Sequence, residues 1–167
     1  RVVADSVDEL KLIECVYAEL AAERVAEGEE PYAPVPVLIR ITPGVHASTH
    51  ESIATAHEDQ KFGMSLQPGT AALAGLDEEE LEHWGVESTD SYAALAAAIL
   101  NATDSLDFRG IHCHIGSQIF EAEGFEQAAT TALEFMNRLN RDLGVTLPEL
   151  DLGGGYGIGY TEADHPR

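Results

Sequence analysis

Residues 110–120 read GIHCHIGSQIF, a short apolar stretch that carries two histidines and ends in a glycine-serine turn. The stretch has the composition of a β-strand, and successive side chains of a strand point to opposite faces of the sheet. His112 and His114 would therefore share one face, with Ile111 and Ile115 on the other. Two imidazoles on one face of an apolar strand indicate either the lining of a site or a pair of hydrogen-bonded core histidines.

A second strand of the same design lies near the end of the chain, where residues 150–159 read LDLGGGYGIG. Glycines after a strand let the backbone turn sharply, and their successive N–H groups can bind an anion. No register of these glycines fits G-x-G-x-x-G, and no Gly-Lys-Ser/Thr follows, so neither a dinucleotide fingerprint nor a P-loop is present. Alone, Gly153, Gly154 and Gly155 could be only a tight turn, but beside Ser117 they would form a phosphate cup.

Strand and helix patterns alternate along the chain. A nearly continuous apolar run at 35–41 is typical of a strand buried on both faces of a parallel sheet. The alternation predicts an α/β fold with right-handed crossovers, either an open sheet or part of a barrel, in which sites form at the C-terminal strand ends. About five strands are expected, at 1–4, 35–41, 61–65, 106–115 and 147–152, with helical segments ending at 26 and spanning 70–76, 91–100 and 126–143.

The helix predicted at 126–143 has the clearest apolar periodicity. Its apolar stripe, close to a 3.6-residue period, consists of Ala129, Leu133, Met136, Leu139 and Leu143.

The chain is strongly acidic for its length. Its 167 residues, enough for one domain, carry 9 Lys and Arg against 30 Asp and Glu, a formal net charge of −21. Such a field repels nucleic acids and anionic membranes, so neither is expected as a partner. Cys15 and Cys113 suggest neither a disulfide framework nor a thiolate zinc site, and no membrane span or signal peptide is visible. A cytoplasmic location is expected, and both ends look cut from a longer protein.

A metal site is a rival interpretation of the two histidines. Some metal-dependent hydrolases place an H-x-H pair on a barrel strand, and a loop with His46, His50 and His57 could add ligands. Such sites also need a carboxylate and a placed base, and Asp151 lies too early on its strand to be an obvious candidate. No metal is therefore expected.

The two stretches, together with residues 37–44 (VLIRITPG) and 54–63 (ATAHEDQKFG), resemble the diaminopimelate decarboxylases. These are pyridoxal-phosphate enzymes of the alanine-racemase-like barrel class. The resemblance implies part of a parallel (β/α)8 TIM-type barrel with about five of eight strands present. Residues 1–167 would be the middle portion of that barrel domain, with the C-terminal β-domain absent. Gln118 and the 54–63 run favour diaminopimelate over ornithine or arginine as substrate.

The resemblance also implies roles for residues. His114 would stack on the ring of pyridoxal 5′-phosphate, with a part in catalysis, while Ser117 and the glycines Gly153, Gly154 and Gly155 would bind its phosphate. Arg40 would lie near the pocket floor. The reaction implied is decarboxylation of meso-diaminopimelate to L-lysine, with the cofactor ring as electron sink, in a homodimer.

Parts of the family pattern lie outside this sequence. They are the lysine that holds the cofactor covalently, a Glu-Pro-Gly-Arg segment and the substrate-binding residues of the second domain. By itself the segment is therefore expected to be inactive. A non-enzymatic pyridoxal-phosphate-binding barrel stays open as an alternative. The acidic stretch 75–90 also departs from the pattern and is expected to be a surface insertion.

Overall fold

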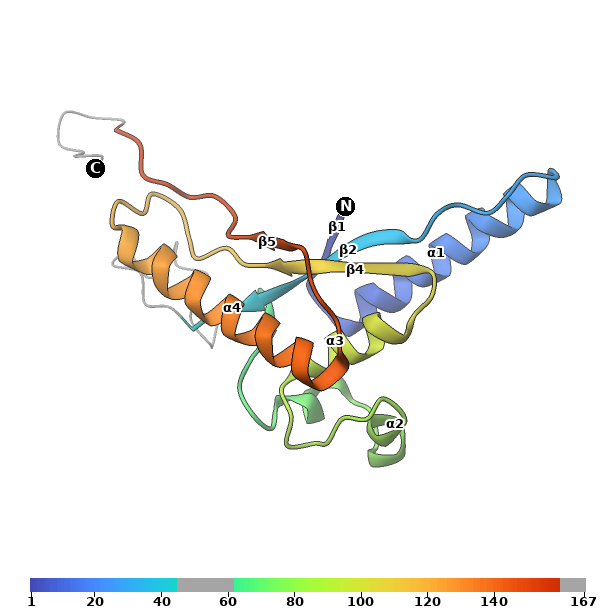
Figure 1. Cartoon of the computed structure of the whole chain (residues 1–167), viewed down its shortest axis with the longest axis horizontal. Coiled ribbons are helices and arrows are strands. Elements are labelled where there is room, and N and C mark those ends of the chain that lie inside the picture. Colours follow the sequence, from blue (N-terminus) through green and yellow to red (C-terminus); the bar gives the residue numbers. More distant parts are fainter. Residues whose placement is uncertain (45–61, 160–167) are drawn as a thin grey trace.

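The computed structural model describes residues 1–44 and 62–159, which build one parallel sheet packed against a layer of helices (Figure 1). The order across the sheet is β1-β2-β4-β5, β3 pairs with the end of β2, and every pairing is parallel. The predicted parallel α/β fold is confirmed. The strands are β1 (Val2–Ala4), β2 (Val35–Thr42), β3 (Met64–Ser65), β4 (Leu106–His112) and β5 (Glu149–Asp151).

The helices cover one side of these strands (Figure 1). They are α1 (Val7–Ala26), the 3₁₀ helix η1 (Thr70–Ala74), α2 (Glu78–His83), α3 (Tyr92–Ala102) and α4 (Ala122–Leu143). Side-chain oxygens cap α1 and α3, since Ser6 accepts from the N–H of Glu9 and Ser91 from that of Ala94. Within the described ranges, none of the helices combines the length and apolarity needed to cross a bilayer.

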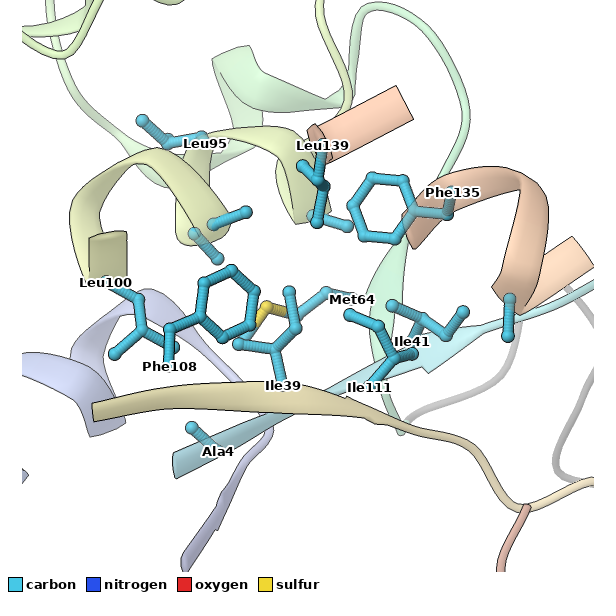
Figure 2. Packing of buried hydrophobic residues seen from close by; sticks show 14 of the residues in the cluster. Ala4, Ile39, Ile41, Met64, Leu95, Leu100, Phe108, Ile111, Phe135 and Leu139 are labelled. Carbon is cyan, nitrogen blue, oxygen red and sulfur yellow. The ribbon is translucent and has the colours of Figure 1, made fainter. Parts of the chain in front are cut away.

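The hydrophobic core lies between the sheet and the helices. Figure 2 shows side chains of β2 and β4 pointing toward α3 and α4. Four buried alanines on α3 let that helix approach the strands closely, because they carry no side chain beyond Cβ. The labelled contributors are Ala4 from β1, Ile39 and Ile41 from β2, Met64 from β3, Phe108 and Ile111 from β4, Leu95 and Leu100 from α3, and Phe135 and Leu139 from α4.

A β-bulge in β4 determines which of its side chains reach this core. Val37 pairs with Phe108 but the next residue, Leu38, pairs with Gly110, so Arg109 is an extra residue in β4. Phe108 and Ile111 are three residues apart, yet both are buried beneath the helices (Figure 2). After the bulge the alternation is regular, and Ile111 and the residues two and four further on, Cys113 and Ile115, are fully buried.

The predicted element boundaries need correction. The strand predicted at 106–115 ends at His112, that predicted at 147–152 is shorter, and α4 begins four residues earlier than expected. The apolar period of α4 coincides only in part with its buried face, because Leu133 is 49% exposed while Phe125 and Phe135, outside that period, are buried. The buried residues of α4 are Phe125, Ala128, Ala132, Phe135 and Leu139.

The acidic run after residue 76 forms the start of a surface helix. Asp77 accepts from the N–H of Glu80 and the Glu80 side chain accepts from the N–H of Asp77, which is a complete capping box. With α1 and the 103–105 turn, α2 lines an acidic groove of about 1180 Å³. Because that turn precedes β4, the groove lies at the opposite end of the strand from the two histidines.

The packing of Ile111 predicts a large loss of stability in Ile111→Ala. Its side chain is fully buried beneath the helices, so truncation should leave a cavity that costs about 2–5 kcal/mol. Urea unfolding of the protein would measure this loss. The control is Leu133→Ala on the outer side of α4, for which the loss should be below about 1 kcal/mol. Equal losses for the two variants would contradict the packing described.

Candidate functional site

The predicted site residues lie where β4 and β5 end. His112 is the last residue of β4, and His114 lies two residues beyond it. Both imidazoles are half-buried, whereas Ile111, Cys113 and Ile115 between and around them are fully buried under the helices. The predicted separation of the two faces is therefore confirmed, with the histidines on the face away from the helical layer.

Two loops that are far apart in the sequence are hydrogen-bonded to each other. The N–H of Ile119 donates to the carbonyl of Gly155 at 2.8 Å, and the N–H of Gly157 donates to the carbonyl of Ile119 at 2.8 Å. The Gln118 side chain bonds both the N–H and the carbonyl of Ile158, each at 3.1 Å. The turn that carries Ser117 and the glycine loop thus form one unit, as the sequence predicted.

Glycine is required where these loops touch. A Cβ on Gly155 would lie 1.8 Å from the carbonyl oxygen of Gly116, and Gly155 has a φ of +99°. A Cβ on Gly153 would lie 2.7 Å from the carbonyl oxygen of Cys113. Gly154 differs, since a Cβ there would meet no atom within 4 Å. The outer glycines therefore pack the loop, and the middle one faces open space.

The N–H groups of the glycine loop differ in whether they already have a hydrogen-bond acceptor in the protein. The N–H of Gly153 donates to Oδ1 of Asp151 at 2.8 Å. In the part of the chain that the structure describes, the N–H groups of Gly154 and Gly155 have no protein acceptor. The Ser117 side chain is exposed beside them. Ser117, Gly154 and Gly155 are thus able to donate to a bound anion, while the N–H of Gly153 serves the loop itself.

His114 has an environment that favours the neutral imidazole. Burial is the main cause of a pKa below its usual value, and the positive charge of Arg40 and the neighbouring His112 lower the pKa further. A neutral imidazole can pack flat against an aromatic ring without an ionic preference of its own. The glycine loop lies directly against this residue, because a Cβ on Gly153 would come within 2.9 Å of its Nδ1.

Arg40 lies beside the two histidines in the sheet. It is the register partner of His112, on the adjacent strand β2. Its guanidinium lies 3.6 Å from Oδ1 of Asp5 and packs 5.1 Å from the centre of the Phe62 ring. The side chain is mostly buried at the C-terminal ends of β1 and β2, and its expected place near the pocket floor stays a prediction.

Asp151 was missed as a site residue by the sequence analysis. It is the register partner of His112 on β5, and its Oδ2 lies 3.1 Å from Nδ1 of that histidine. The N–H of Gly153 is the main cause of a lowered pKa of the Asp151 carboxyl, and the nearby His112 lowers it further. The signal was available, because an acidic residue two positions before a glycine can accept its N–H.

The rival metal site has no support in the described ranges. No group of three His, Cys, Asp or Glu is arranged there to hold a metal ion. His46, His50 and His57, the further ligands that the rival interpretation would use, lie outside the described residues.

The residues present fit pyridoxal phosphate. The N–H groups of Gly154 and Gly155 and the hydroxyl of Ser117 are uncharged donors at one edge, suited to a phosphate. Gly154 leaves the space that a Cβ would occupy open. The imidazole of His114 lies next to the loop, where an aromatic ring attached to that phosphate would extend.

The environment of His114 predicts its titration. Burial and two positive neighbours disfavour the imidazolium, so its pKa in the folded protein should lie below 6.5. Since the unfolded chain would bind the proton first, acidification below about 6.5 should reduce stability until pH falls past the lowered value. NMR titration of the imidazole protons would measure the midpoint. Arg40→Gln should raise it and the remote Arg138→Gln should not, whereas an ordinary midpoint in the unmodified protein would contradict the assignment.

Comparison with known proteins identifies the family. The family model described as "Pyridoxal-dependent decarboxylase, pyridoxal binding domain" matches residues 1–89 and 77–167, so the two matches together cover the chain. The chain is 46% identical over 166 residues to a diaminopimelate decarboxylase of Corynebacterium efficiens and 37% identical over 132 residues to that of Bacillus subtilis. The two alignments cover 99% and 79% of this chain, but only 29% and 25% of the respective relatives.

Solved structures agree with the sequence comparison. One match is diaminopimelate decarboxylase from Helicobacter pylori, complexed with L-lysine, with a TM-score of 0.67 at 25% identity. The superposition covers 97% of this chain and 32% of the H. pylori chain. A second match is the enzyme from M. jannaschii, in co-complex with L-lysine, with a TM-score of 0.66 at 27% identity. It covers 99% of this chain and 30% of the M. jannaschii chain. The likeness confirms that the parallel sheet is an arc of a barrel. The chain belongs to the pyridoxal-binding domain family of the pyridoxal-dependent decarboxylases.

Proposed function

We propose that this chain is the middle portion of the pyridoxal-phosphate-binding barrel of a diaminopimelate decarboxylase. The protein would convert meso-diaminopimelate to L-lysine and CO2. The observation that carries the proposal is the union of the Ser117 turn with the glycine loop beside His114, which builds an anion cradle next to a neutral imidazole. Curated relatives at 46% and 40% identity carry this enzyme's name.

Each site residue has a defined part in this proposal. Bound pyridoxal phosphate would supply an electron sink for the charge left when the substrate carboxylate departs. Ser117 donates its hydroxyl to the phosphate, and Gly154 and Gly155 donate their N–H groups. Gly153 belongs to the same cradle through its turn rather than through its N–H. His114 packs against the ring and keeps water from that face.

The choice of substrate rests on the relatives. Two related enzymes were solved with L-lysine, the product expected here, which supports a substrate with a second amino group. Gln118 bonds the main chain of Ile158 on both sides, so its contribution is to the shape of the loop. Residues 54–61, the other part of the substrate argument, lie outside the described residues.

The proposal extends to the rest of the protein. The chain spans only 29% and 25% of the length of the two curated relatives named above. We place a C-terminal β-domain with the substrate-binding residues outside residues 1–167, and a homodimer in the cytoplasm as the working form. The net charge of −21 supports a partner set without nucleic acid or anionic membrane.

The test uses the full-length protein that contains this chain. Release of CO2 and formation of lysine from meso-diaminopimelate would be measured with added pyridoxal phosphate, with ornithine and arginine as comparison substrates. Turnover of meso-diaminopimelate above the other two supports the proposal. A bound cofactor, seen by its absorbance, without turnover of any of the three would favour the non-enzymatic barrel and overturn the decarboxylase assignment.

The glycine loop predicts opposite results for two neighbouring substitutions. Gly154→Ala adds a Cβ that meets no protein atom within 4 Å, so folding should be unaffected while the phosphate is pushed away and cofactor affinity falls. Gly155→Ala would force a contact of 1.8 Å with the Gly116 carbonyl, so the melting temperature should fall as the loops separate. Calorimetry and cofactor titration would measure both. Unchanged affinity in Gly154→Ala would remove the phosphate from this loop.

Ser117 and His114 should have separable effects. Ser117→Ala removes one donor to a charged group and should weaken cofactor binding by about 1–3 kcal/mol, with turnover at saturating cofactor largely retained. His114→Ala should weaken stacking and also slow turnover. The control is Ser88→Ala, an exposed serine remote from the strand ends. Cofactor titration and steady-state kinetics that show normal values for both site variants would refute the assignment.

A further inference from the structure

Asp151 joins the end of the sheet to the glycine loop through three contacts. Its main-chain carbonyl accepts from the N–H of Cys113 at 2.9 Å, which ties β5 to the segment after β4. Its Oδ1 accepts from the N–H of Gly153 at 2.8 Å, which fixes the first turn of the loop. Its Oδ2 lies 3.1 Å from Nδ1 of His112. One side chain therefore contacts both the loop and the strand that carries His112.

His112 is placed to restrict the movement of the Asp151 carboxylate. Its Nδ1 is shielded from solvent, and the 3.1 Å approach to Oδ2 is close without being aligned as a hydrogen bond, so the ring and the carboxylate are in direct contact. The imidazole side chain is 16% exposed and the Asp151 side chain 52% exposed. The more rigid, buried partner thus holds the more exposed one. Arg40 on the other side of His112 has its own carboxylate partner in Asp5.

The loop depends on where its first turn is held. Gly153 has a φ of +71°, and a Cβ added there would clash with Cys113 and His114. If the Asp151 carboxylate swung away, the N–H of Gly153 would lose its acceptor and the turn would no longer be fixed. The N–H groups of Gly154 and Gly155 follow directly on this turn, so their direction is set by it. A donor aimed in advance binds an anion more tightly than one that must be ordered on binding.

We infer that His112 and Asp151 form a positioning pair that sets the affinity for the phosphate group of the cofactor without touching the cofactor. The inference rests on the proposed function, because the phosphate is that of pyridoxal phosphate. Asp151 orients the glycine loop through the N–H of Gly153, and His112 orients Asp151. Neither residue is a catalytic residue in this arrangement. The pair stands apart from Ser117 and His114, which face the ligand.

The discriminating experiment compares two ligands that differ only in the phosphate. Pyridoxal phosphate and pyridoxal would be titrated into cofactor-free full-length protein. Asp151→Ala should weaken binding of pyridoxal phosphate about tenfold or more, the effect of losing a charge-assisted hydrogen bond, and leave that of pyridoxal unchanged. Asp151→Asn keeps an oxygen for the N–H of Gly153 and should retain most of the affinity. Asp142→Ala removes an exposed carboxylate of α4 and should not change the affinity for either ligand.

Variants of His112 test the second half of the pair. His112→Asn places an amide N–H near the position of Nδ1 and should keep phosphate affinity, whereas His112→Leu should lose it to the extent that Asp151→Ala does. The double variant His112→Leu with Asp151→Ala should be no weaker than Asp151→Ala alone, because the two act through one contact. Amide exchange of the 152–156 segment in cofactor-free protein, measured by mass spectrometry, should be faster in His112→Leu.

The outcomes separate this inference from the proposed function. If the unmodified protein binds neither ligand, the proposed function fails. If it binds pyridoxal phosphate and Asp151→Ala binds both ligands as well as the unmodified protein does, the positioning pair is wrong and the function stands. Equal losses for pyridoxal and pyridoxal phosphate would likewise overturn the inference, because they would indicate general damage to the pocket. Thermal unfolding of each variant checks that it is folded.

Discussion

The parallel pairing of β4 between β2 and β5 is the constraint on which the site depends. In that register Arg40, His112 and Asp151 stand at the same level on three adjacent strands. The strands end there together, so the turn with Ser117 and the glycine loop leave the sheet side by side and can exchange hydrogen bonds. A shift of either neighbour by one residue would place the row on the helical side and bury charges in the core.

Two nitrogen-bearing side chains of this row each have a carboxylate near them. Asp5 lies beside Arg40 and Asp151 beside His112, while His114 keeps a lowered pKa and stays neutral. The donors proposed for the phosphate are accordingly backbone N–H groups and a hydroxyl instead of a free side-chain cation. In a chain of net charge −21 a local device of this kind is needed, because the overall field opposes an anion.

Much of the fold could be predicted from the sequence, and the features that could not be predicted have physical causes. Apolar runs and capping residues located all five strands and the main helices, since burial and capping are local properties of the chain. The apolar period of α4 does not by itself give its buried face, because two phenylalanines outside that period are buried. The bulge at Arg109 was not predicted, and it changes the phase of the strand between Phe108 and Ile111. The pairing of Asp151 with His112 depends on strand register, which no local pattern contains.

The bulge in β4 has a consequence for changes of chain length. Phe108 pairs with Val37, Gly110 pairs with Leu38, and Arg109 has no partner of its own in the ladder. Deletion of Arg109 would therefore leave the other residue pairs of β4 in phase, with both histidines still on their present face. It would remove the ion pairs of Arg109 with Glu149 and with Asp107. Loss of a residue after the bulge would instead invert the strand end and turn the histidines toward the helices, so position 109 is the point in β4 where the chain can shorten without moving the site.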